Sequence, residues 1–216
     1  MIRRSPLLHR VMIVRLAVLG DSIAHGVGAT RPQDALGPGL VRALDAAGRP
    51  AQCRVFAVPG ARSADLARQV PAATAWHPHV AVIVIGANDL TRFVPPGEAA
   101  GQLADAVRRL RAGGTAVVVA PAPDLSVVPH VPPALRELVR TASARLRREQ
   151  QQAALAAGAR IADVTNAVAT SFAADRTLFS GDLFHPSSAG YAIITEALVP
   201  QVRAALPPAE RMRATG

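Results

Sequence analysis

A serine, an aspartate and a histidine in this chain have the spacing that nucleophilic acyl transfer needs. Ser22 follows an apolar run and a Gly-Asp pair, so a turn there can project its hydroxyl from the edge of a sheet. A serine hydroxyl attacks only when a base lies beside it. Asp182 precedes His185 by three residues, so its carboxylate can hold the imidazole through Nδ1 and leave Nε2 as the base. Taken singly, Ser22 can also be a helix cap and the Asp-His pair an ordinary surface loop.

Two further positions offer hydrogen bonds to a developing negative charge. Gly60 follows an apolar run, and a glycine lets its backbone N–H approach a ligand closely. Asn88, within Gly86-Ala87-Asn88-Asp89, has an uncharged carboxamide with two N–H groups, which suits an oxyanion hole. Alternatively, Gly60 is a turn glycine and the Asn-Asp pair is an Asx turn capping the next helix, a role that fits Asp89 better. With the nucleophile and its base, these donors complete a set of parts for acyl transfer.

The composition excludes several other chemistries. The 216-residue sequence has 24 Lys and Arg residues, and all of them are Arg. The absence of Lys excludes a Walker A phosphate loop, Schiff-base catalysis and the Ser-x-x-Lys arrangement of penicillin-recognising enzymes. A single Cys excludes an internal disulfide, a Cys-cluster zinc site and a Cys-ligated iron–sulfur centre. His and carboxylate residues are too dispersed for a metal site, so we expect neither metal nor cofactor.

The net charge of +9 raises the question of nucleic-acid binding. A nucleic-acid footprint gathers basic residues on one face, whereas the Arg residues here are scattered along the chain. Their densest run, at 136–148, has the pattern of the polar side of an amphipathic helix. Aromatic residues make up 3% of the chain, which argues against a platform that stacks bases or sugars. We therefore expect no nucleic-acid partner and rank such a function last.

Five short apolar runs, several of them rich in β-branched residues, predict strands. The first, third and fourth have the near-continuous pattern of strands that are covered on both faces. Longer stretches between the runs predict helices, some of them bounded by Ser or Gly caps. The predicted strands are residues 14–19, 53–58, 80–85, 115–120 and 159–164, and the predicted helices are residues 36–47, 63–69, 98–112, 133–157 and 188–205.

Strand and helix alternate five times without a hairpin signal, which predicts parallel strands joined by right-handed crossovers. We therefore expect a three-layer α/β/α sandwich around a five-stranded parallel sheet, in the flavodoxin-like order 2-1-3-4-5. In such sheets function lies beyond the carboxyl ends of the strands, where most of the polar segments above fall. The expected division is a flexible tail at 1–12, a single domain at 13–206 and a flexible tail at 207–216. The Pro-rich residues 121–133 are a candidate for a mobile flap, or lid, at the same edge.

The N-terminal segment has some features of a signal peptide and lacks others. Arg3 and Arg4 precede apolar residues, but Arg15 interrupts the apolar run and no small-residue cleavage site follows. No apolar stretch reaches the roughly 18–20 residues that span a bilayer. With no disulfide expected, these features favour a cytoplasmic location and argue against stable insertion in a membrane.

In combination and in order, the four polar segments resemble the blocks of the SGNH hydrolases, the GDSL-type esterases and lipases. The matching residues span positions 20 to 185 and are Gly20-Asp21-Ser22, Gly60, Gly86-Ala87-Asn88-Asp89 and Asp182-Leu183-Phe184-His185. The resemblance implies that Ser22 is the nucleophile, that His185 is the general base and that Asp182 orients it. It also implies an oxyanion hole formed by the Ser22 N–H, the Gly60 N–H and the Asn88 side chain, on a flavodoxin-like three-layer fold. The Gly-x-Ser-x-Gly elbow of ordinary α/β-hydrolases is absent.

We therefore expect a serine hydrolase that cleaves a small-molecule carboxylic ester through an acyl-enzyme on Ser22. A thioesterase, a lysophospholipase or a carbohydrate deacetylase would use the same machinery, and a non-catalytic binding protein is the alternative from another class. The sequence leaves the oligomeric state open. Candidate substrate contacts are Asp21, His25, Asp89, Leu90 and Phe93.

Other reactive side chains have simpler explanations. His77 and His79 precede the third predicted strand, away from the expected site, and Cys53 is expected to pack as a small apolar side chain. Arg62 and Arg92 follow the two predicted oxyanion segments, where an anionic substrate group could meet them. Solvated loop residues are the default interpretation of both.

Overall fold

The computed structural model describes residues 12–162, 164 and 166–206. The predicted flexible tails at 1–12 and 207–216 therefore lie outside the described residues, with the exception of Met12. Met12 packs against the hydrophobic core instead of belonging to a tail. The division into a single domain with two flexible tails stays a prediction.

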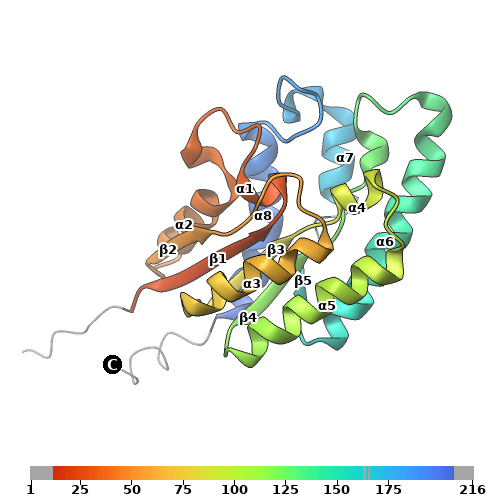
Figure 1. Cartoon of the computed structure of the whole chain (residues 1–216). Coiled ribbons are helices and arrows are strands. Elements are labelled where there is room, and N and C mark those ends of the chain that lie inside the picture. The colour runs from red at the N-terminus through yellow and green to blue at the C-terminus, as the bar shows by residue number, and fades with distance from the viewer. Residues whose placement is uncertain (1–11, 163, 165, 207–216) are drawn as a thin grey trace, which may run out of the picture.

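A five-stranded parallel sheet forms the centre of the molecule, in the order β2-β1-β3-β4-β5 (Figure 1). This order confirms the predicted flavodoxin-like topology. The three inner strands are buried almost throughout, because helices cover both of their faces, and this explains their near-continuous apolar runs. The strands are β1 (Val14–Gly20), β2 (Ala51–Val55), β3 (Val80–Val84), β4 (Ala116–Ala120) and β5 (Arg160–Ile161).

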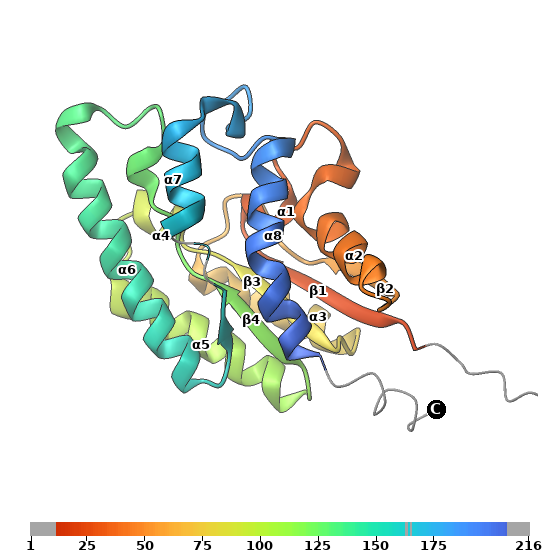
Figure 2. The same cartoon turned by 180° about the vertical axis from the view of Figure 1, so that it is seen from behind.

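Helices cover the sheet on both faces, which gives the predicted three layers (Figures 1 and 2). One face carries α2 (Leu36–Ala46), α7 (Asn166–Ala174) and α8 (Ser188–Ala205), whereas the other carries α3 (Leu66–Ala75) and α5 (Pro96–Ala112), with α6 (Arg136–Ala156) beside α5. Side chains alternate across each strand, so Leu16 of β1 packs toward α2 and α8, and Leu19 packs toward α3. None of the helices in the described ranges is both long and apolar enough to cross a lipid bilayer.

Two short helices follow the first and third strands, and the sequence pattern predicts neither. They are α1 (Ser22–His25) and α4 (Ala87–Thr91), and both are too short to show a helical period in the sequence. The helix α7 was also not predicted. Five 3₁₀ turns complete the described elements, and they are η1 (Pro32–Asp34), η2 (Ser63–Asp65), η3 (Leu125–Val127), η4 (Pro133–Leu135) and η5 (Arg176–Leu178).

The edge strands β2 and β5 are shorter than the apolar runs at 53–58 and 159–164 predict. β2 starts earlier than predicted as well, because Ala51 pairs with Val14 at the start of β1. Beyond β2 the chain stays beside β1, because the Phe56 N–H donates to the Val18 carbonyl at 2.8 Å and the Val58 N–H donates to the Gly20 carbonyl at 3.1 Å. The Gly20 N–H alone has no backbone acceptor among the described residues on that side, and it donates to the side chain of Gln69 instead.

The helix predicted at 63–69 begins as the 3₁₀ turn η2 and continues as α3 well beyond its predicted end. The predicted end is wrong because α3 passes through Pro71 without stopping. Pro71 has no N–H for the carbonyl of Ala67 one turn earlier. Arg109 Nη1 on α5 lies 3.5 Å from that oxygen, so a side chain partly compensates for the missing backbone bond.

The Pro-rich residues 121–133, which are a candidate flap, pack against the body of the protein. The side chains of Leu125 and Val128 are buried. His130 Nε2 donates a hydrogen bond of 2.8 Å to the backbone carbonyl of Asp182. The segment is thus attached both to the core and to the loop that carries one of the predicted site residues.

Candidate active site

The strand order places the predicted functional segments side by side at one edge of the sheet. β1 lies between β2 and β3, so the turn after β1, which carries Ser22, is flanked by the loops that carry Gly60 and Asn88. The short helices α1 and α4 lie at this end of the sheet (Figure 1). Asn88 Nδ2 donates to the backbone carbonyl of Ala61 at 3.0 Å, so the two flanking loops meet beside the Ser22 turn.

A tight turn at Gly20 presents Ser22 at the sheet edge. Gly20 has a φ of +133°, and a Cβ there would lie 1.8 Å from the carbonyl oxygen of Val84 on β3, so only glycine fits. Asp21 then caps α1, because its side chain accepts a hydrogen bond of 3.0 Å from the Ile23 N–H. Ser22 is the first residue of α1 and is 8% exposed.

Ser22, His185 and Asp182 form a continuous chain of hydrogen bonds. Ser22 Oγ lies 2.9 Å from His185 Nε2, and His185 Nδ1 lies 2.6 Å from Asp182 Oδ2. When Nδ1 carries the proton that Asp182 accepts, Nε2 is free to accept the proton of the serine hydroxyl. The fold therefore brings together, from distant parts of the chain, the three residues that the sequence predicts for nucleophilic attack.

Nearby donors hold the Asp182 carboxylate in place. Its Oδ1 accepts hydrogen bonds from Ser180 Oγ at 2.8 Å and from the backbone N–H groups of Phe184 and His185 at 2.9 Å. Burial alone would raise the pKa of Asp182, but these bonds and the bond from His185 Nδ1 hold that pKa well below its usual range. Asp182 is therefore ionised at neutral pH and can stabilise an imidazolium at His185.

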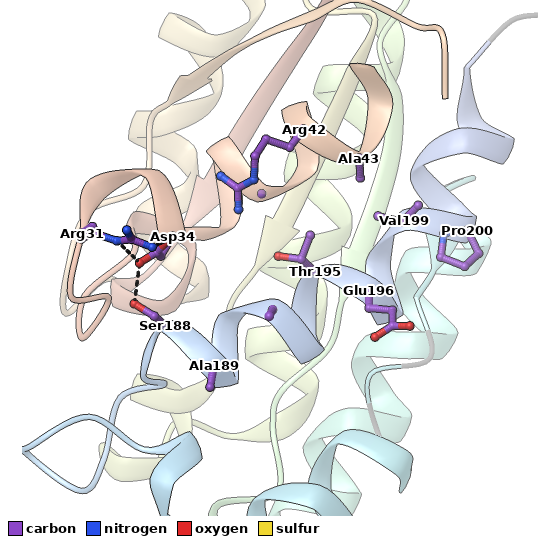
Figure 3. Close-up of a pocket in the computed structure, with 12 residues that line it drawn as sticks. Arg31, Asp34, Arg42, Ala43, Ser188, Ala189, Thr195, Glu196, Val199 and Pro200 are labelled. Carbon is purple, nitrogen blue, oxygen red and sulfur yellow. Dashed lines mark hydrogen bonds and ion pairs between the residues drawn. The ribbon is translucent and has the colours of Figure 1, made fainter. Parts of the chain in front are cut away.

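The loop that carries His185 is held against the connection between β1 and α2. Gly28, with a φ of +93°, lies so close that a Cβ there would come within 2.9 Å of the His185 Cβ. Beyond the loop, Ser188 Oγ donates to Asp34 Oδ2 at 2.9 Å, and Asp34 also pairs with Arg31 (Figure 3). The loop that carries His185 is thus held to this connection at two points, near Gly28 and at Asp34.

Two N–H donors flank the Ser22 turn in the way an oxyanion hole requires. Gly60 is exposed, has a φ of +81°, and its N–H donates to no group in the described part of the chain. One N–H of the Asn88 carboxamide donates to Ala61, and the other remains for a ligand. With the Ser22 N–H, these groups could meet a negative charge that develops on a carbonyl oxygen.

Two of the predicted substrate contacts are wrong for this structure. Asp21 and Asp89 are 1% and 0% exposed, so neither carboxylate can reach a substrate. Asp89 does not cap its own helix either, because both of its oxygens accept from the Ser63 N–H at 3.1 Å and Oδ2 accepts from Ser63 Oγ at 3.0 Å. Ser63, the first residue of the helix predicted at 63–69, donates its hydroxyl to Asp89 and does not cap that helix. Burial raises the pKa of both carboxyl groups, that of Asp21 to about 7.

The other three predicted contacts differ in their surroundings. His25 is exposed, and its Nδ1 donates to the carbonyl of Ala57 at 3.2 Å. Leu90 is partly buried and packs against the core, so it supports the position of α4. Phe93 is 92% exposed and has a φ of +54°, which is uncommon for a bulky side chain. His25 and Phe93 therefore stay candidates for contact with a substrate.

Several residues that were not predicted hold the site in place. Ser180 lies two residues before Asp182, and short-range bonds from serine hydroxyls are foreseeable from sequence. Ser63, Gln69 and His130 act on site residues that are 26, 49 and 52 positions away. No local pattern in the sequence could have identified these three.

His79 and Cys53, two of the residues set aside in the sequence, lie apart from the triad. His79 Nδ1 accepts the Arg15 N–H at 2.9 Å, at the opposite end of the sheet. Cys53 is partly buried on β2, and burial raises the pKa of its thiol to about 12. Among the described residues, no group of three His, Cys, Asp or Glu side chains could hold a metal ion.

A hollow of about 750 Å³ lies between α2 and α8 (Figure 3). Arg42, Thr195 and Glu196 are among the residues that line it, and none of the three triad residues does. It is therefore separate from the Ser22 chemistry.

Comparison with protein families finds one that covers this site. The chain matches the model of the GDSL-like lipase/acylhydrolase family over residues 18–193. Among curated proteins it is similar to the GDSL-like esterase Rv1075c of Mycobacterium tuberculosis (strain ATCC 25618 / H37Rv), with 38% identity over 197 residues. That alignment covers 89% of this chain, and the chain spans 63% of the length of the relative.

Solved structures share the fold. The crystal structure of TesA has a TM-score of 0.72 and 23% identity, and the match covers 89% of this chain and 99% of TesA. A structure of Axe2, an acetylxylan esterase from Geobacillus stearothermophilus, has a TM-score of 0.71 and 19% identity, covering 89% and 96% of the two chains. The esterase EstA from Pseudoalteromonas sp. has a TM-score of 0.69 and 17% identity, covering 88% and 97%. At these identities the likeness shows the fold, whereas the family match over residues 18–193, which contains the whole triad, shows that the chain belongs to the GDSL-like lipase/acylhydrolase family.

Proposed function

We propose that this protein hydrolyses carboxylic esters of small molecules through an acyl-enzyme on Ser22. The observation that carries the proposal is the hydrogen-bond chain from Ser22 Oγ to His185 at 2.9 Å and from His185 to Asp182 at 2.6 Å. Membership of the GDSL-like family supports the same reaction. The chain needs no further group for this chemistry, because nucleophile, base and oxyanion donors are all side-chain or backbone groups of its own.

In the first half of the reaction, Ser22 Oγ attacks the ester carbonyl while His185 Nε2 takes the hydroxyl proton. The carbonyl oxygen becomes an oxyanion that accepts hydrogen bonds from the Ser22 and Gly60 N–H groups and from Asn88 Nδ2. Asp182 stabilises the imidazolium that forms. The intermediate then collapses, and the imidazolium gives its proton to the departing alcohol, which leaves the acyl group on Ser22.

In the second half, His185 Nε2 takes a proton from a water molecule that attacks the acyl-enzyme. The same donors stabilise the second oxyanion, and its collapse returns the proton to Ser22 Oγ. The carboxylic acid leaves and the free enzyme is restored. Both halves use one base and one set of donors, which is consistent with the single site at the end of β1.

Ser22→Ala tests the nucleophile directly. We expect it to abolish hydrolysis of short p-nitrophenyl esters and to leave the circular dichroism spectrum unchanged, since the side chain supplies the attacking oxygen. Wild-type protein should also take up a fluorophosphonate on Ser22. Ser171→Ala is a matched control, because Ser171 is a partly exposed serine on α7 whose hydroxyl bonds, within the described ranges, to the Ala167 carbonyl alone. Unchanged turnover in Ser22→Ala, or labelling at another residue, would refute the assignment.

Asn88→Ala tests the oxyanion hole. We expect kcat to fall by roughly 10²–10³, because one donor to the transition state is lost. KM should change little, since that donor acts on charge that develops after binding. A loss confined to KM would show that Asn88 binds the ground state instead.

The substrate within the ester class is a second question. Axe2 is described as an acetylxylan esterase and the Mycobacterium tuberculosis relative as an esterase, which favours an oxygen ester with a small acyl group. Thioesters, lysophospholipids and acetylated sugars remain the alternatives for the same machinery. A panel that varies acyl length and leaving group separates them, because kcat/KM should peak on one class and fall steeply on the others.

We propose that nucleic acid is not a partner and that the protein acts in the cytoplasm. The Arg-rich stretch falls on α6, where Arg140 pairs with Glu137 and Arg145 with Glu149, as on a solvated helix face. A salt-dependent DNA affinity that survives Ser22→Ala would contradict the first statement. Recovery of the native protein in a membrane or secreted fraction would contradict the second. A purely binding role is opposed by the complete triad, and fluorophosphonate labelling decides it.

A further inference from the structure

The two loops that supply the candidate oxyanion donors are joined by buried bonds that the chemistry itself does not use. Two consecutive residues of α4 take part: Asn88 bonds to Ala61, and Asp89 bonds to Ser63. Gly60 lies immediately before these two partners on the other loop. The positions of Gly60 and Asn88 relative to each other are therefore set by this contact between the loops.

The bond between Asp89 and Ser63 is the stronger of the two links. It consists of three hydrogen bonds of 3.0 to 3.1 Å, in which the Ser63 N–H and the Ser63 hydroxyl donate to the Asp89 carboxylate oxygens. Ser63 is 1% exposed and Asp89 is 0% exposed, so water does not compete for these bonds. Because both groups are buried, each end would be costly to leave unpaired in this place.

The geometry of the Gly60 loop shows what this link holds. The Ala61 N–H donates to the Val58 carbonyl at 3.1 Å, which closes a tight turn around Gly60. Ser63 then anchors the end of that turn to α4. A shift of Ser63 would move the Gly60 N–H, and a shift of Asp89 would move the neighbouring Asn88 carboxamide. Either shift changes the distance between the two donors.

We propose that Asp89 and Ser63 are positioning residues for the oxyanion hole, acting as a buried clamp that fixes the Gly60 and Asn88 donors against each other. This inference rests on the proposed ester hydrolysis and goes beyond it. Neither residue touches the substrate, because both are buried behind the donors. Their contribution is to hold donors where the oxyanion forms, and a displacement of about 1 Å in such a group can cost roughly 10² in rate.

Asp89→Asn and Ser63→Ala test the clamp. Asn keeps the size of Asp but places an N–H group where the Ser63 donors need an acceptor, and Ala removes one of the three bonds. We expect Asp89→Asn to lower kcat roughly 10-fold to 100-fold with little change in KM, and Ser63→Ala to lower kcat less. The inhibition constant of a phenylboronic acid, which forms a tetrahedral adduct on Ser22, should rise by the same factor as kcat/KM falls.

Thr115→Val is the matched control. Thr115 is 2% exposed, and its hydroxyl donates to the Pro78 carbonyl at 3.1 Å, at the opposite end of the sheet. Removing it costs a buried hydroxyl bond without touching either donor loop. It should lower stability and leave kcat per fluorophosphonate-labelled site unchanged. If Asp89 had only a structural role, Asp89→Asn would likewise lower stability and leave kcat per labelled site unchanged.

The Asn88→Ala background gives a sharper test. If the clamp acts by aligning Asn88 with Gly60, then Asp89→Asn should cost far less in a protein that already lacks the Asn88 donor. An equal loss in both backgrounds would overturn the assignment. So would Asp89→Asn and Ser63→Ala variants that keep wild-type kcat and boronate affinity. If Asp89→Asn does not fold, Ser63→Ala carries the test alone and in the Asn88→Ala background. A wild-type protein that neither hydrolyses esters nor labels at Ser22 overturns the proposed function, and this inference with it.

Discussion

Gln69 and Gly20 form a pair of hydrogen bonds in which a side chain supplies the acceptor that the Gly20 N–H lacks on the backbone. The Gly20 N–H donates to Gln69 Oε1, and Gln69 Nε2 donates to the Gly20 carbonyl, both at 2.8 Å. A carboxamide offers the same donor and acceptor as a peptide group, so Gln69 of α3 partners the Gly20 N–H and shares the Gly20 carbonyl with the Val58 N–H, which donates to it at 3.1 Å. Gln69 is 5% exposed. The turn that presents Ser22 therefore starts from a fixed residue.

Gln69→Leu should lower the free energy of unfolding by about 1–3 kcal/mol. The leucine has a similar volume, but it leaves the buried Gly20 N–H without a partner. Denaturant unfolding measures the change. Gln52→Leu is the control, because Gln52 is exposed on the edge strand β2 and its loss should stay within about 0.5 kcal/mol. Equal stabilities of the two variants would show that the pair adds nothing to the fold.

Gly28→Ala should lower kcat by more than a loss of stability alone explains. Its Cβ would lie 2.5 Å from the Pro186 carbonyl oxygen and 2.9 Å from the His185 Cβ, so the base must move. We expect kcat to fall by roughly 10²-fold. Gly48→Ala is the control, since Gly48 also has a positive φ, of +71°, but no atom within 4 Å of the added Cβ. That variant should lose only about 1–2 kcal/mol of stability, which is the cost of the left-handed conformation, and keep its activity. Similar kcat values in the two variants would contradict the prediction.

Asp21→Asn should change how stability depends on pH. Burial raises the pKa of Asp21 from 3.8 to about 7 in the folded protein, so between these values the folded chain holds a proton that the unfolded chain releases. Stability from this group is therefore present at low pH and is lost as the pH rises through about 7. Asparagine keeps the cap of α1 and cannot ionise. Urea unfolding from about pH 4 to pH 8 should show Asp21→Asn gaining on wild type, and parallel curves would refute the shift.

Cys53 should resist thiol reagents in the native protein. Burial raises the pKa of its thiol to about 12, so almost no thiolate exists at neutral or mildly alkaline pH. Reaction with a disulfide reagent should be slow until denaturant is added and then be complete. Rapid labelling of the folded protein would show that β2 opens readily at this edge of the sheet.

The fold could be predicted from the sequence because buried strands leave strong apolar runs in it. The inner strands are apolar on both faces, and the alternation of strand and helix fixes the topology once parallel connections are assumed. Ser22, Asp182 and His185 could be predicted as candidate site residues for a different reason, since their types and local spacing are typical of acyl transfer. α1 and α4 were not accessible, because helices of this length leave no period.

The environment of each polar residue was the part that the sequence could not predict. Asp89 directly follows Asn88 in the sequence, yet the Asp89 side chain is buried and the Asn88 side chain is partly exposed. A carboxylate in a polar loop looks available for binding until the residue that satisfies it is known. Here that residue is Ser63, on another loop, and only the folded chain brings the two together.

Ser22 follows the first strand and His185, 163 positions later in the sequence, precedes α8. A growing chain on the ribosome therefore carries the proposed nucleophile, Ser22, long before the proposed base, His185, is made. Until the C-terminal segment docks, the exposed serine is chemically ordinary, because nothing withdraws its proton. The onset of ester hydrolysis during refolding should therefore report when the C-terminal segment docks. The helix α8, which follows His185, holds the loop that completes the site.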